Sequence, residues 1–361
     1  MRHQNVLALV TDAYGGRGGI AQYNCDFLSA LAGCGTVLSI TVMPRHAPDP
    51  ALPPARVRQA PPRRGRLSFT VMALVTALSR RVDLVFCGHL HLALVAASIA
   101  YLKGAKLIIQ MHGVEAWRRP SRLRCAAIET ADLVLCVSRH TRARVVGWAD
   151  IPPERVMVLP NTIEDIFRPK DSLLRTKLAP ESKRMLLTVG RMDSSERYKG
   201  HDRVIAALPA VIAKGHDLVY VVVGDGDDQR RLRNLAREVG VAERVRFLGR
   251  VGPERLADLY RATDLFVMPS TGEGFGIAFL EALASGTPAL GLNVAGAADA
   301  LGDGELGTLV SEDELAVAID RLLSAPSRDP HALSESARAK FGRDAFGLRV
   351  CAALDRIRPT A

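Results

Sequence analysis

The chain of 361 residues lacks any long hydrophobic run. A membrane-spanning helix needs about 20 consecutive apolar residues. The longest candidate, Leu90–Leu102, is shorter than this and contains His91. The first apolar run, Val6–Val10, is too short for a signal peptide and leads straight into a polar segment. We therefore expect a cytoplasmic protein without a transmembrane helix.

Cysteine pairs and aromatic residues are also scarce. The six cysteines are scattered and form no Cys-x-x-Cys motif, which predicts a reducing compartment and neither a disulfide framework nor a zinc site. Aromatic residues make up 5% of the chain. No nucleic-acid-binding module and no Walker phosphate loop is recognisable, so a nucleic acid is not expected as a partner.

Length and charge indicate two domains of different character. The length suits two domains, and the 48% of apolar residues suffice for two cores. Residues 1–170 contain 22 Lys and Arg against 11 Asp and Glu, whereas the remainder contains 26 against 27. The first half thus carries the whole positive excess. This distribution favours an anionic membrane surface or a phosphate-bearing acceptor, and solubility is the alternative explanation.

A glycine-rich loop follows the first predicted strand, Val6–Val10. The loop contains Gly16, Gly18 and Gly19 and precedes a helical pattern, so backbone can approach a ligand closely there. Gly16–Ala21 also fits the Gly-x-Gly-x-x-Ala dinucleotide pattern. That pattern needs an acid after the second strand, but this strand ends in Pro44, Arg45 and His46. The missing acid disfavours NAD as a ligand, whereas Arg45 leaves NADP open as an alternative. Residues 44–62 read as an irregular loop.

A histidine ends another predicted strand of the first domain. His112 follows the strand Lys106–Gln110, and in a doubly wound sheet this end of a strand borders the ligand crevice. A structural histidine is the alternative. Glu115 is a candidate for shaping an acceptor pocket. Leu67–Ser79 reads as a helix, and Leu90–Leu102 reads as a buried helix.

A second series of strands and helices begins at Met185, after a predicted linker over 167–183. Arg191 follows the strand Met185–Val189, and Lys199 ends the charged loop behind it. Both are candidates for neutralising a diphosphate, and a solvated basic loop is the alternative. Asp225 and Asp227 form an Asp-x-Asp pair, a pattern that can hold Mg²⁺ between phosphates.

The most informative stretch is residues 264–288. A short apolar strand ends at Pro269, and a loop with three glycines leads into a helix that starts at Ile277. Free backbone N–H groups at a helix start favour an anion. Glu273 in the loop and Glu281 in the helix are better suited to accept hydrogen bonds from sugar hydroxyls, and solvated acids are the alternative.

These motifs resemble those of a known enzyme family. Glu273 and Glu281 with the seven residues between them resemble the Glu-x7-Glu motif of the family-four retaining glycosyltransferases, and the stretch 190–202 resembles that family's donor-phosphate motif. The resemblance implies α/β architecture of the GT-B type, with two Rossmann-like doubly wound domains facing across a cleft. The implied domains are 1–170, with helix 346–361 crossing back onto it, and 171–345.

The resemblance also implies site residues. His112 would contact the transferred sugar, Glu273 its hydroxyls and Glu281 the ribose, while Arg191 and Lys199 would stabilise the leaving diphosphate. The remaining implied donor contacts are Gly16, Gly18, Gly19, Arg250, Val251, Gly274, Phe275, Gly276 and Ile277. The family's Gly-Gly-x-x-Glu segment is altered here to Ala295-Gly-Ala-Ala-Asp299, which weakens the expectation of donor contacts at that edge.

The function implied by the resemblance is retaining, metal-independent transfer of a hexose, with mannose as one candidate. The donor would be a GDP- or UDP-linked sugar, and no cofactor is expected. The acceptor would be a lipid-linked sugar, a polysaccharide or a lipopolysaccharide at the inner face of the membrane. A GT-B epimerase or phosphorylase, an NADP-dependent oxidoreductase and an inactive nucleotide-sugar-binding protein remain alternatives.

Overall fold

The computed structural model describes residues 4–49, 51–170, 183–326 and 328–357. It divides into two compact units, residues 1–162 with 343–361 and residues 163–342. The predicted boundaries were 170/171 and 345/346. Most of the predicted linker, residues 171–182, lies outside the described residues.

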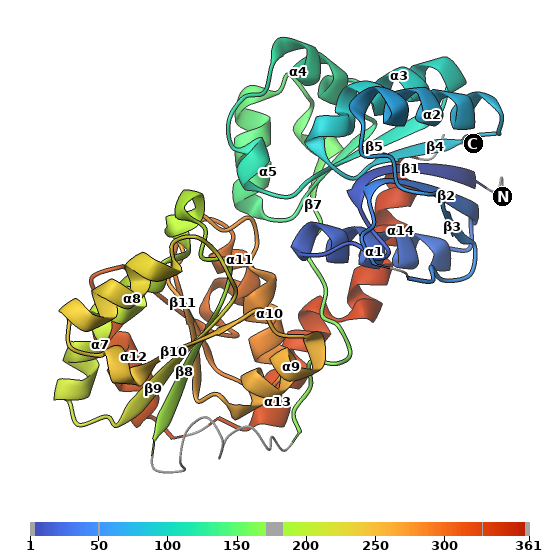
Figure 1. Cartoon of the computed structure of the whole chain (residues 1–361). Helices are drawn as coiled ribbons and strands as arrows, with labels where there is room; N and C mark the ends of the chain where they lie inside the picture. The colour runs from blue at the N-terminus through green and yellow to red at the C-terminus, as the bar shows by residue number, and fades with distance from the viewer. Residues whose placement is uncertain (1–3, 50, 171–182, 327, 358–361) are drawn as a thin grey trace. The chain divides into compact units, whose positions relative to one another are not determined.

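The first unit is a parallel sheet covered by helices on both faces (Figure 1). Its described strands have the order β3-β2-β1-β4-β5-β6-β7. The strands are β1 Gln4–Asp12, β2 Val37–His46, β3 Val57–Gln59, β4 Leu84–Cys87, β5 Lys106–Met111, β6 Leu133–Cys136 and β7 Val156–Val158. The helices are α1 Gly19–Gly33, α2 Arg66–Leu78, α3 Ala93–Lys103, α4 Arg122–Glu129, α5 Arg139–Trp148 and α14 Arg343–Arg356, with the short 3-10 helices η1 Leu90–Leu92, η2 Val114–Ala116 and η3 Pro153–Arg155.

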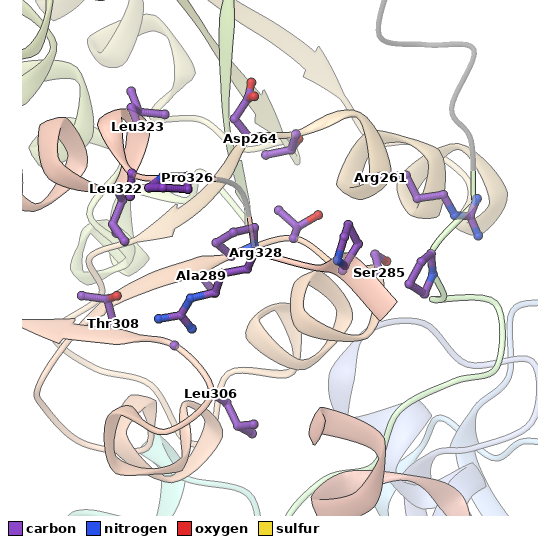
Figure 2. A pocket seen from close by; sticks show the side chains of 18 of the residues that line it. Arg261, Asp264, Ser285, Ala289, Leu306, Thr308, Leu322, Leu323, Pro326 and Arg328 are labelled. Atoms are coloured by element: carbon purple, nitrogen blue, oxygen red, sulfur yellow. The ribbon is translucent and has the colours of Figure 1, made fainter. Parts of the chain in front are cut away.

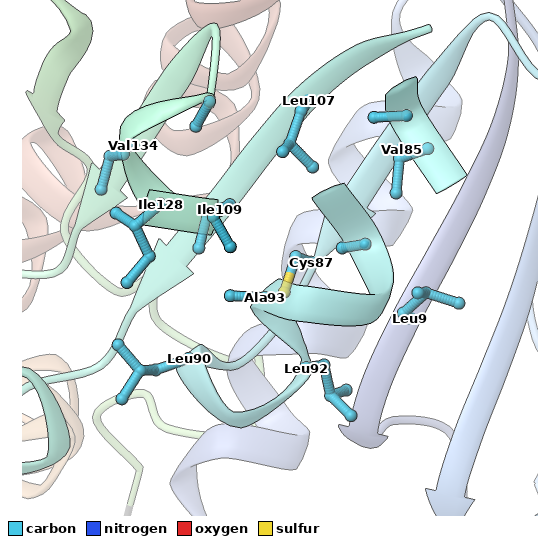
Figure 3. Close-up of a cluster of buried hydrophobic side chains, with 14 of the residues drawn as sticks. Leu9, Val85, Cys87, Leu90, Leu92, Ala93, Leu107, Ile109, Ile128 and Val134 are labelled. Atoms are coloured by element: carbon cyan, nitrogen blue, oxygen red, sulfur yellow. The ribbon is translucent and has the colours of Figure 1, made fainter. Parts of the chain in front are cut away.

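The two faces of this sheet are covered by different sets of helices. Helices α2 to α5 cover one face, and α1 and α14 cover the other (Figure 1). The strands are apolar on both sides, because a parallel sheet between two helix layers is buried on both faces. Figure 3 shows the cluster under α3 and α4, where Leu9, Cys87 and Ile109 of three strands meet Ala93 and Ile128 of the helices.

The second unit repeats this architecture with the order β10-β9-β8-β11-β12-β13. The strands are β8 Arg184–Val189, β9 Leu218–Val223, β10 Val245–Gly249, β11 Leu265–Met268, β12 Ala289–Leu292 and β13 Thr308–Val310. The helices are α7 His201–Ala213, α8 Gln229–Glu238, α9 Pro253–Ala262, α10 Ile277–Ala284, α11 Ala297–Ala300, α12 Leu315–Ser324 and α13 Pro330–Phe341, with the 3-10 helices η4 Ser194–Lys199, η5 Ala242–Arg244 and η6 Gly302–Gly304. A core under α7, α8 and α12 includes Ile205, Leu232 and Ile319.

Two local predictions for the first unit are wrong in part. Residues 44–62 are not wholly irregular, because β2 continues to His46 and Val57–Gln59 adds a parallel edge strand next to it. The segment Leu90–Leu102 is helical as predicted, but it is buried on one face only. It divides into η1 and α3, which packs through small residues such as Ala96, while Tyr101 and Leu102 are 88% and 60% exposed. Small side chains let α3 approach the sheet closely, and its outer face remains in solvent.

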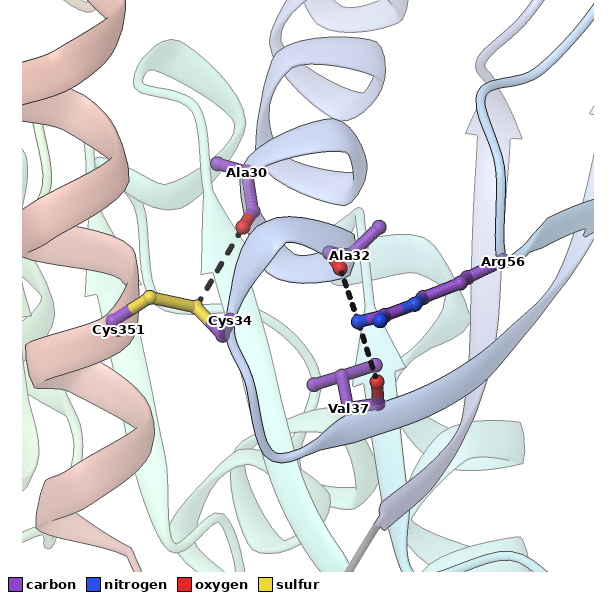
Figure 4. The surroundings of a disulfide bond; sticks show 6 residues. All are labelled: Ala30, Ala32, Cys34, Val37, Arg56 and Cys351. Carbon is purple, nitrogen blue, oxygen red and sulfur yellow. Dashed lines mark hydrogen bonds between the residues drawn. A yellow bond between two sulfur atoms is a disulfide. The ribbon is translucent and has the colours of Figure 1, made fainter.

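The expected absence of disulfides is also wrong. Cys34, at the end of α1, is bonded to Cys351 of α14, and the Cα atoms are 5.7 Å apart (Figure 4). The bond joins positions 317 residues apart in the sequence, so no short spacing motif could have revealed it. The C-terminal helix is thus covalently attached to the first helix of the same unit.

Titration of the thiols tests this pairing. Denatured, unreduced protein should show four reactive thiols, since Cys25, Cys87, Cys125 and Cys136 are not in disulfides. Cys351→Ser should lower the free energy of unfolding by about 3 kcal/mol, because the bond restricts the unfolded chain. Cys25→Ser, which leaves the bond intact, is the control. Six reactive thiols would refute the pairing.

Candidate functional site

The two central strands of the second sheet end side by side. β8 and β11 are adjacent and parallel. The next strands in the chain after β8, β9 and β10, lie on one side of this pair, and the strands after β11, β12 and β13, lie on the other side. The place where the strand order reverses in this way is the topological switch point. In doubly wound sheets, ligands bind there, beyond the carboxyl ends of the strands. Arg191 follows β8, and the loop 269–276 follows β11. The fold therefore brings the two halves of the predicted donor site to one edge.

Lys199 and Glu273 are joined by a buried ion pair at this edge. The Nζ atom of Lys199 donates to Oε1 of Glu273, and the two side chains are 18% and 8% exposed. Burial by itself lowers the pKa of Lys199, but the charge and hydrogen bond of Glu273 outweigh it and raise the pKa. The lysine therefore keeps its charge in a site that is largely shielded from water.

The turn after Lys199 depends on glycine. Gly200 has a φ of 80°, and a Cβ atom at this position would lie 2.3 Å from the carbonyl oxygen of Pro269. The chain before α7 is therefore pressed against the end of β11. This close backbone contact holds Lys199 next to the loop that carries Glu273.

Arg191 is close to this pair in sequence but is held differently. Its guanidinium forms an ion pair with Glu196, and its side chain is 71% exposed. Its carbonyl oxygen lies 3.2 Å from Nε2 of His201, a buried imidazole at the start of α7. The partners Glu196 and His201 were not predicted. His201 lies within the stretch 190–202 that resembles the donor-phosphate motif, and this membership is the signal that points to it.

Glu281 lies in α10 and accepts a hydrogen bond from Tyr260. The hydroxyl of Tyr260 is 2.8 Å from Oε2 of Glu281. Burial raises the pKa of Glu281, the Tyr260 hydrogen bond opposes this shift and the nearby Glu164 charge adds to it, so that the pKa is about 7. The carboxyl group therefore changes its charge near neutral pH. No pattern in the sequence connected Tyr260 with Glu281.

The loop between β11 and α10 is fixed from two sides. Phe275 is 3% exposed and its ring packs on that of Phe341. The carbonyl oxygen of Glu273 accepts a 2.9 Å hydrogen bond from the N–H of Gly296. Gly276, with a φ of 98°, turns the chain into α10, so that Ile277 begins the helix. The predicted residues 273–277 thus form one ordered turn.

The altered segment after β12 packs directly on this loop. A Cβ atom at Gly296 would lie 2.3 Å from the carbonyl oxygen of Gly274, so this glycine is required. Ala295, where the family pattern has the other glycine, has a φ of 51°. The chain therefore places alanine in a backbone conformation that is unfavourable for it.

Two further predicted positions lie on the β9–β10 side. Asp225–Asp227 forms a turn in which the Asp227 carboxylate accepts hydrogen bonds from the N–H and hydroxyl of Ser194. Arg250 follows β10 and is 3.9 Å from Asp225 between charged atoms. Val251 is half-buried beside it.

The first unit has its own switch point, between β1 and β4. The glycine loop follows β1, and a Cβ atom at Gly16 would lie 2.8 Å from the carbonyl oxygen of Ala13. Gly18 has a φ of 87° and precedes α1, which starts at Gly19. Arg45, on which the NADP alternative depended, donates to the carbonyl oxygen of Arg64.

His112 lies at the end of β5 as predicted and is held by the neighbouring strand. Its Nε2 atom is 2.8 Å from the carbonyl oxygen of Gly88, and its ring meets that of Tyr23 edge to face. Burial lowers its pKa, despite the Glu115 charge and the Gly88 hydrogen bond. With Nε2–H donating, the neutral ring keeps Nδ1 as an acceptor. Glu115 accepts a 2.6 Å hydrogen bond from the His112 N–H.

Sequence reasoning missed His89, which lies beside His112. The two ring centroids are 6.0 Å apart, and burial followed by the neighbouring His112 lowers the pKa of His89 to about 4. Its position directly after β4, at the switch point, is the signal that could have identified it.

The large pocket in Figure 2 is at the opposite edge of the second sheet. It has a volume of about 700 Å³ and borders the first residues of three strands, Arg184, Ala289 and Thr308. The candidate donor residues follow the last residues of the strands. This pocket is therefore separate from the switch point.

The fold and the switch-point residues define a GT-B-type glycosyltransferase architecture, and structural comparison supports this class. The Anabaena protein Alr3699/HepE, solved in complex with UDP and glucose, has a TM-score of 0.78 and 20% identity over 98% of this chain and 100% of that one. Sucrose-phosphate synthase of Thermosynechococcus elongatus has a TM-score of 0.77 and 23% identity, covering 98% and 99%. At these identities the likeness shows the fold.

The sequence comparisons identify the family. Residues 170–340 match glycosyl transferases group 1, and residues 17–165 match glycosyltransferase family 4. The GDP-mannose-dependent alpha-(1-6)-phosphatidylinositol monomannoside mannosyltransferase of Mycobacterium tuberculosis is 30% identical over 88% of this chain and 89% of that protein. The chain belongs to the group 1 glycosyltransferases, a family of transferases, and the oxidoreductase alternative is set aside.

Another relative matches over a shorter range. D-inositol 3-phosphate glycosyltransferase 2 of Catenulispora acidiphila is 35% identical over 56% of this chain. The alignment spans about half the length of this and similar curated relatives.

The pKa of Glu281 gives a prediction for stability. A carboxyl group with a raised pKa in the folded state stabilises that state at low pH and loses this contribution as the pH rises through the folded pKa. Relative to Glu281→Gln, the wild type should become less stable between about pH 4.5 and pH 8, by up to about 3 kcal/mol. Denaturant unfolding at several pH values measures this. A pH-independent difference would contradict the burial of Glu281.

The conformation of Ala295 gives a second prediction. Ala295→Gly should raise the free energy of unfolding by about 0.5–1 kcal/mol, because glycine adopts a positive φ without strain. The control Ala297→Gly, in the helical segment α11, should lower it by a similar amount. Thermal unfolding distinguishes the two. Destabilisation by both variants would show that Ala295 is not strained.

Proposed function

We propose that the protein transfers a hexose from a nucleoside-diphosphate sugar to a hydroxyl group of an acceptor, with the donor held at the switch point of the second unit. The observation that carries this proposal is the buried Lys199–Glu273 pair at the carboxyl ends of β8 and β11. It offers a cation for phosphate oxygens and a carboxylate for sugar hydroxyls within one shielded edge.

Stabilisation of the leaving group is the main catalytic contribution in this proposal. When the bond between the anomeric carbon and the phosphate oxygen breaks, negative charge grows on the diphosphate. Lys199, which is largely shielded from water, supplies the opposing potential together with the more exposed Arg191 and the N–H groups at the start of α10. This contribution needs no metal ion.

The stereochemistry proposed is retention at the anomeric carbon. The acceptor hydroxyl oxygen forms the new bond on the face from which the diphosphate departs. Its proton passes to the departing phosphate oxygen, so no protein carboxylate is needed as a nucleophile. Glu281 would hold the ribose hydroxyls, for which its ionised form is the better acceptor, and His112 would contact the transferred sugar.

The donor and acceptor are proposed from the relatives. The mycobacterial relative is named as GDP-mannose-dependent and as acting on a phosphatidylinositol monomannoside, which favours GDP-mannose and a lipid-linked acceptor. UDP-glucose is the second candidate, because the Anabaena structure holds UDP and glucose. The excess of basic residues in 1–170 suits an acceptor at an anionic membrane surface. Within the described residues, no helix is long and apolar enough to cross a membrane.

Nucleotide binding at the switch point gives the test. GDP, UDP, ADP and their sugars are compared by thermal shift in EDTA, with NADPH as a control. One nucleoside diphosphate should raise the melting temperature by mass action. Lys199→Ala should weaken its binding by about 10- to 100-fold, because a charge-assisted hydrogen bond is lost. Lys214→Ala, at an exposed lysine of the same unit, is the control.

A double variant separates binding from folding. Lys199→Ala leaves the Glu273 charge buried without its partner, which destabilises a protein on its own. Lys199→Met combined with Glu273→Gln removes both charges at similar volume and should fold but not bind. Normal nucleotide binding by this variant, or a shift with NADPH alone, would contradict the proposal.

A further inference from the structure

Helix α2 of the first unit presents an unusual outer face. It packs on the sheet through Phe69, Ala73 and Ala77, which are buried. On its other side, four large apolar residues follow each other at helical spacing: Leu67, Val71, Val75 and Leu78 are 79%, 49%, 51% and 67% exposed. Single exposed apolar residues are common, but a continuous apolar stripe indicates an interaction surface.

The apolar surface continues on the neighbouring helix. α2 and α3 lie side by side in the layer that covers one face of the sheet (Figure 1). α3 adds three further exposed apolar residues, Leu94, Tyr101 and Leu102. The helix next to α2 in this layer therefore also has large apolar side chains in solvent.

The charged residues in the segment that contains α2 are all positive. Between Asp49 and Asp83 the sequence contains no acidic residue. Arg63, Arg64 and Arg66 are exposed at the start of α2, and no salt bridge is formed by them within the described part of the chain. Arg80 and Arg81 are exposed at its end, where Arg81 pairs with Asp83 at 2.9 Å. Both ends of the apolar stripe are thus flanked by arginines.

We propose that the outer face of α2, with its four exposed apolar side chains and flanking arginines, lies in the surface of an anionic lipid bilayer. The apolar side chains enter the boundary between head groups and acyl chains, while the arginines extend to lipid phosphates. A second copy of the chain fits less well, because it would bring arginines against arginines. This inference rests on the proposed function, because a surface that binds the bilayer serves an enzyme whose acceptor is in the membrane.

Vesicle co-sedimentation tests the proposal with the full chain and no substrate. Vesicles of phosphatidylcholine with phosphatidylglycerol are compared with pure phosphatidylcholine. The wild type should bind the anionic vesicles, and salt should weaken the binding without abolishing it. The triple variant Leu67→Ser, Val71→Ser, Val75→Ser should bind at least about tenfold more weakly, because the buried apolar area is lost.

The matched control carries the same number of changes elsewhere. Leu38, Val317 and Leu348 are also exposed, at 55%, 69% and 75%, but lie on separate elements. Their replacement by serine should leave vesicle binding unchanged. Both variants should retain the nucleotide-induced thermal shift, so that loss of membrane binding is distinguished from failure of the proposed donor site. Equal vesicle binding by the wild type and the α2 variant, or equal binding to neutral vesicles, would overturn the proposal.

Two further measurements exclude other occupants of the face. Brominated lipids should quench the fluorescence of the tryptophan introduced by Val71→Trp, whereas they should not quench that of the tryptophan introduced by Val317→Trp. Light scattering gives the oligomeric state. A wild-type dimer that the triple serine variant converts to a monomer would assign the face to self-association and refute the bilayer proposal.

Discussion

The ion pair between Lys199 and Glu273 is the interaction on which the candidate donor site depends. Two opposite charges with 18% and 8% of their side-chain surface exposed are costly to bury, and their mutual attraction has to offset that cost. The pair forms because Gly200 lets the chain pass within contact distance of Pro269. A cation and an acceptor are thereby held at the edge where the two central strands end.

The same geometric rule organises both units. In each sheet the strand order proceeds outward on both sides of a central pair of strands. The loops that follow the two central strands therefore meet at one edge of the sheet. In the second unit this edge gathers Arg191, Lys199 and Glu273. In the first unit it gathers the glycine loop, His89 and His112. Loops that are distant in sequence become neighbours because parallel strands end on the same side.

The sequence was sufficient to predict strands and site residues where local patterns determine the structure. Apolar runs located most strands, and their ends placed Arg191, Glu273 and His112 near the sheet edges. It was insufficient where contacts join distant segments. The Tyr260–Glu281 hydrogen bond and the Cys34–Cys351 bond connect positions that share no spacing. α13, with a mixed polar sequence, gave no clear periodicity and was not predicted.

Hydrogen exchange of the intact protein, with and without the nucleoside diphosphate that binds, tests the central claim most directly. The account predicts new protection at 189–200 and 270–281, the segments that surround the Lys199–Glu273 pair. Protection concentrated at 14–21, with none at 270–281, would contradict the assignment of the donor site to the second unit.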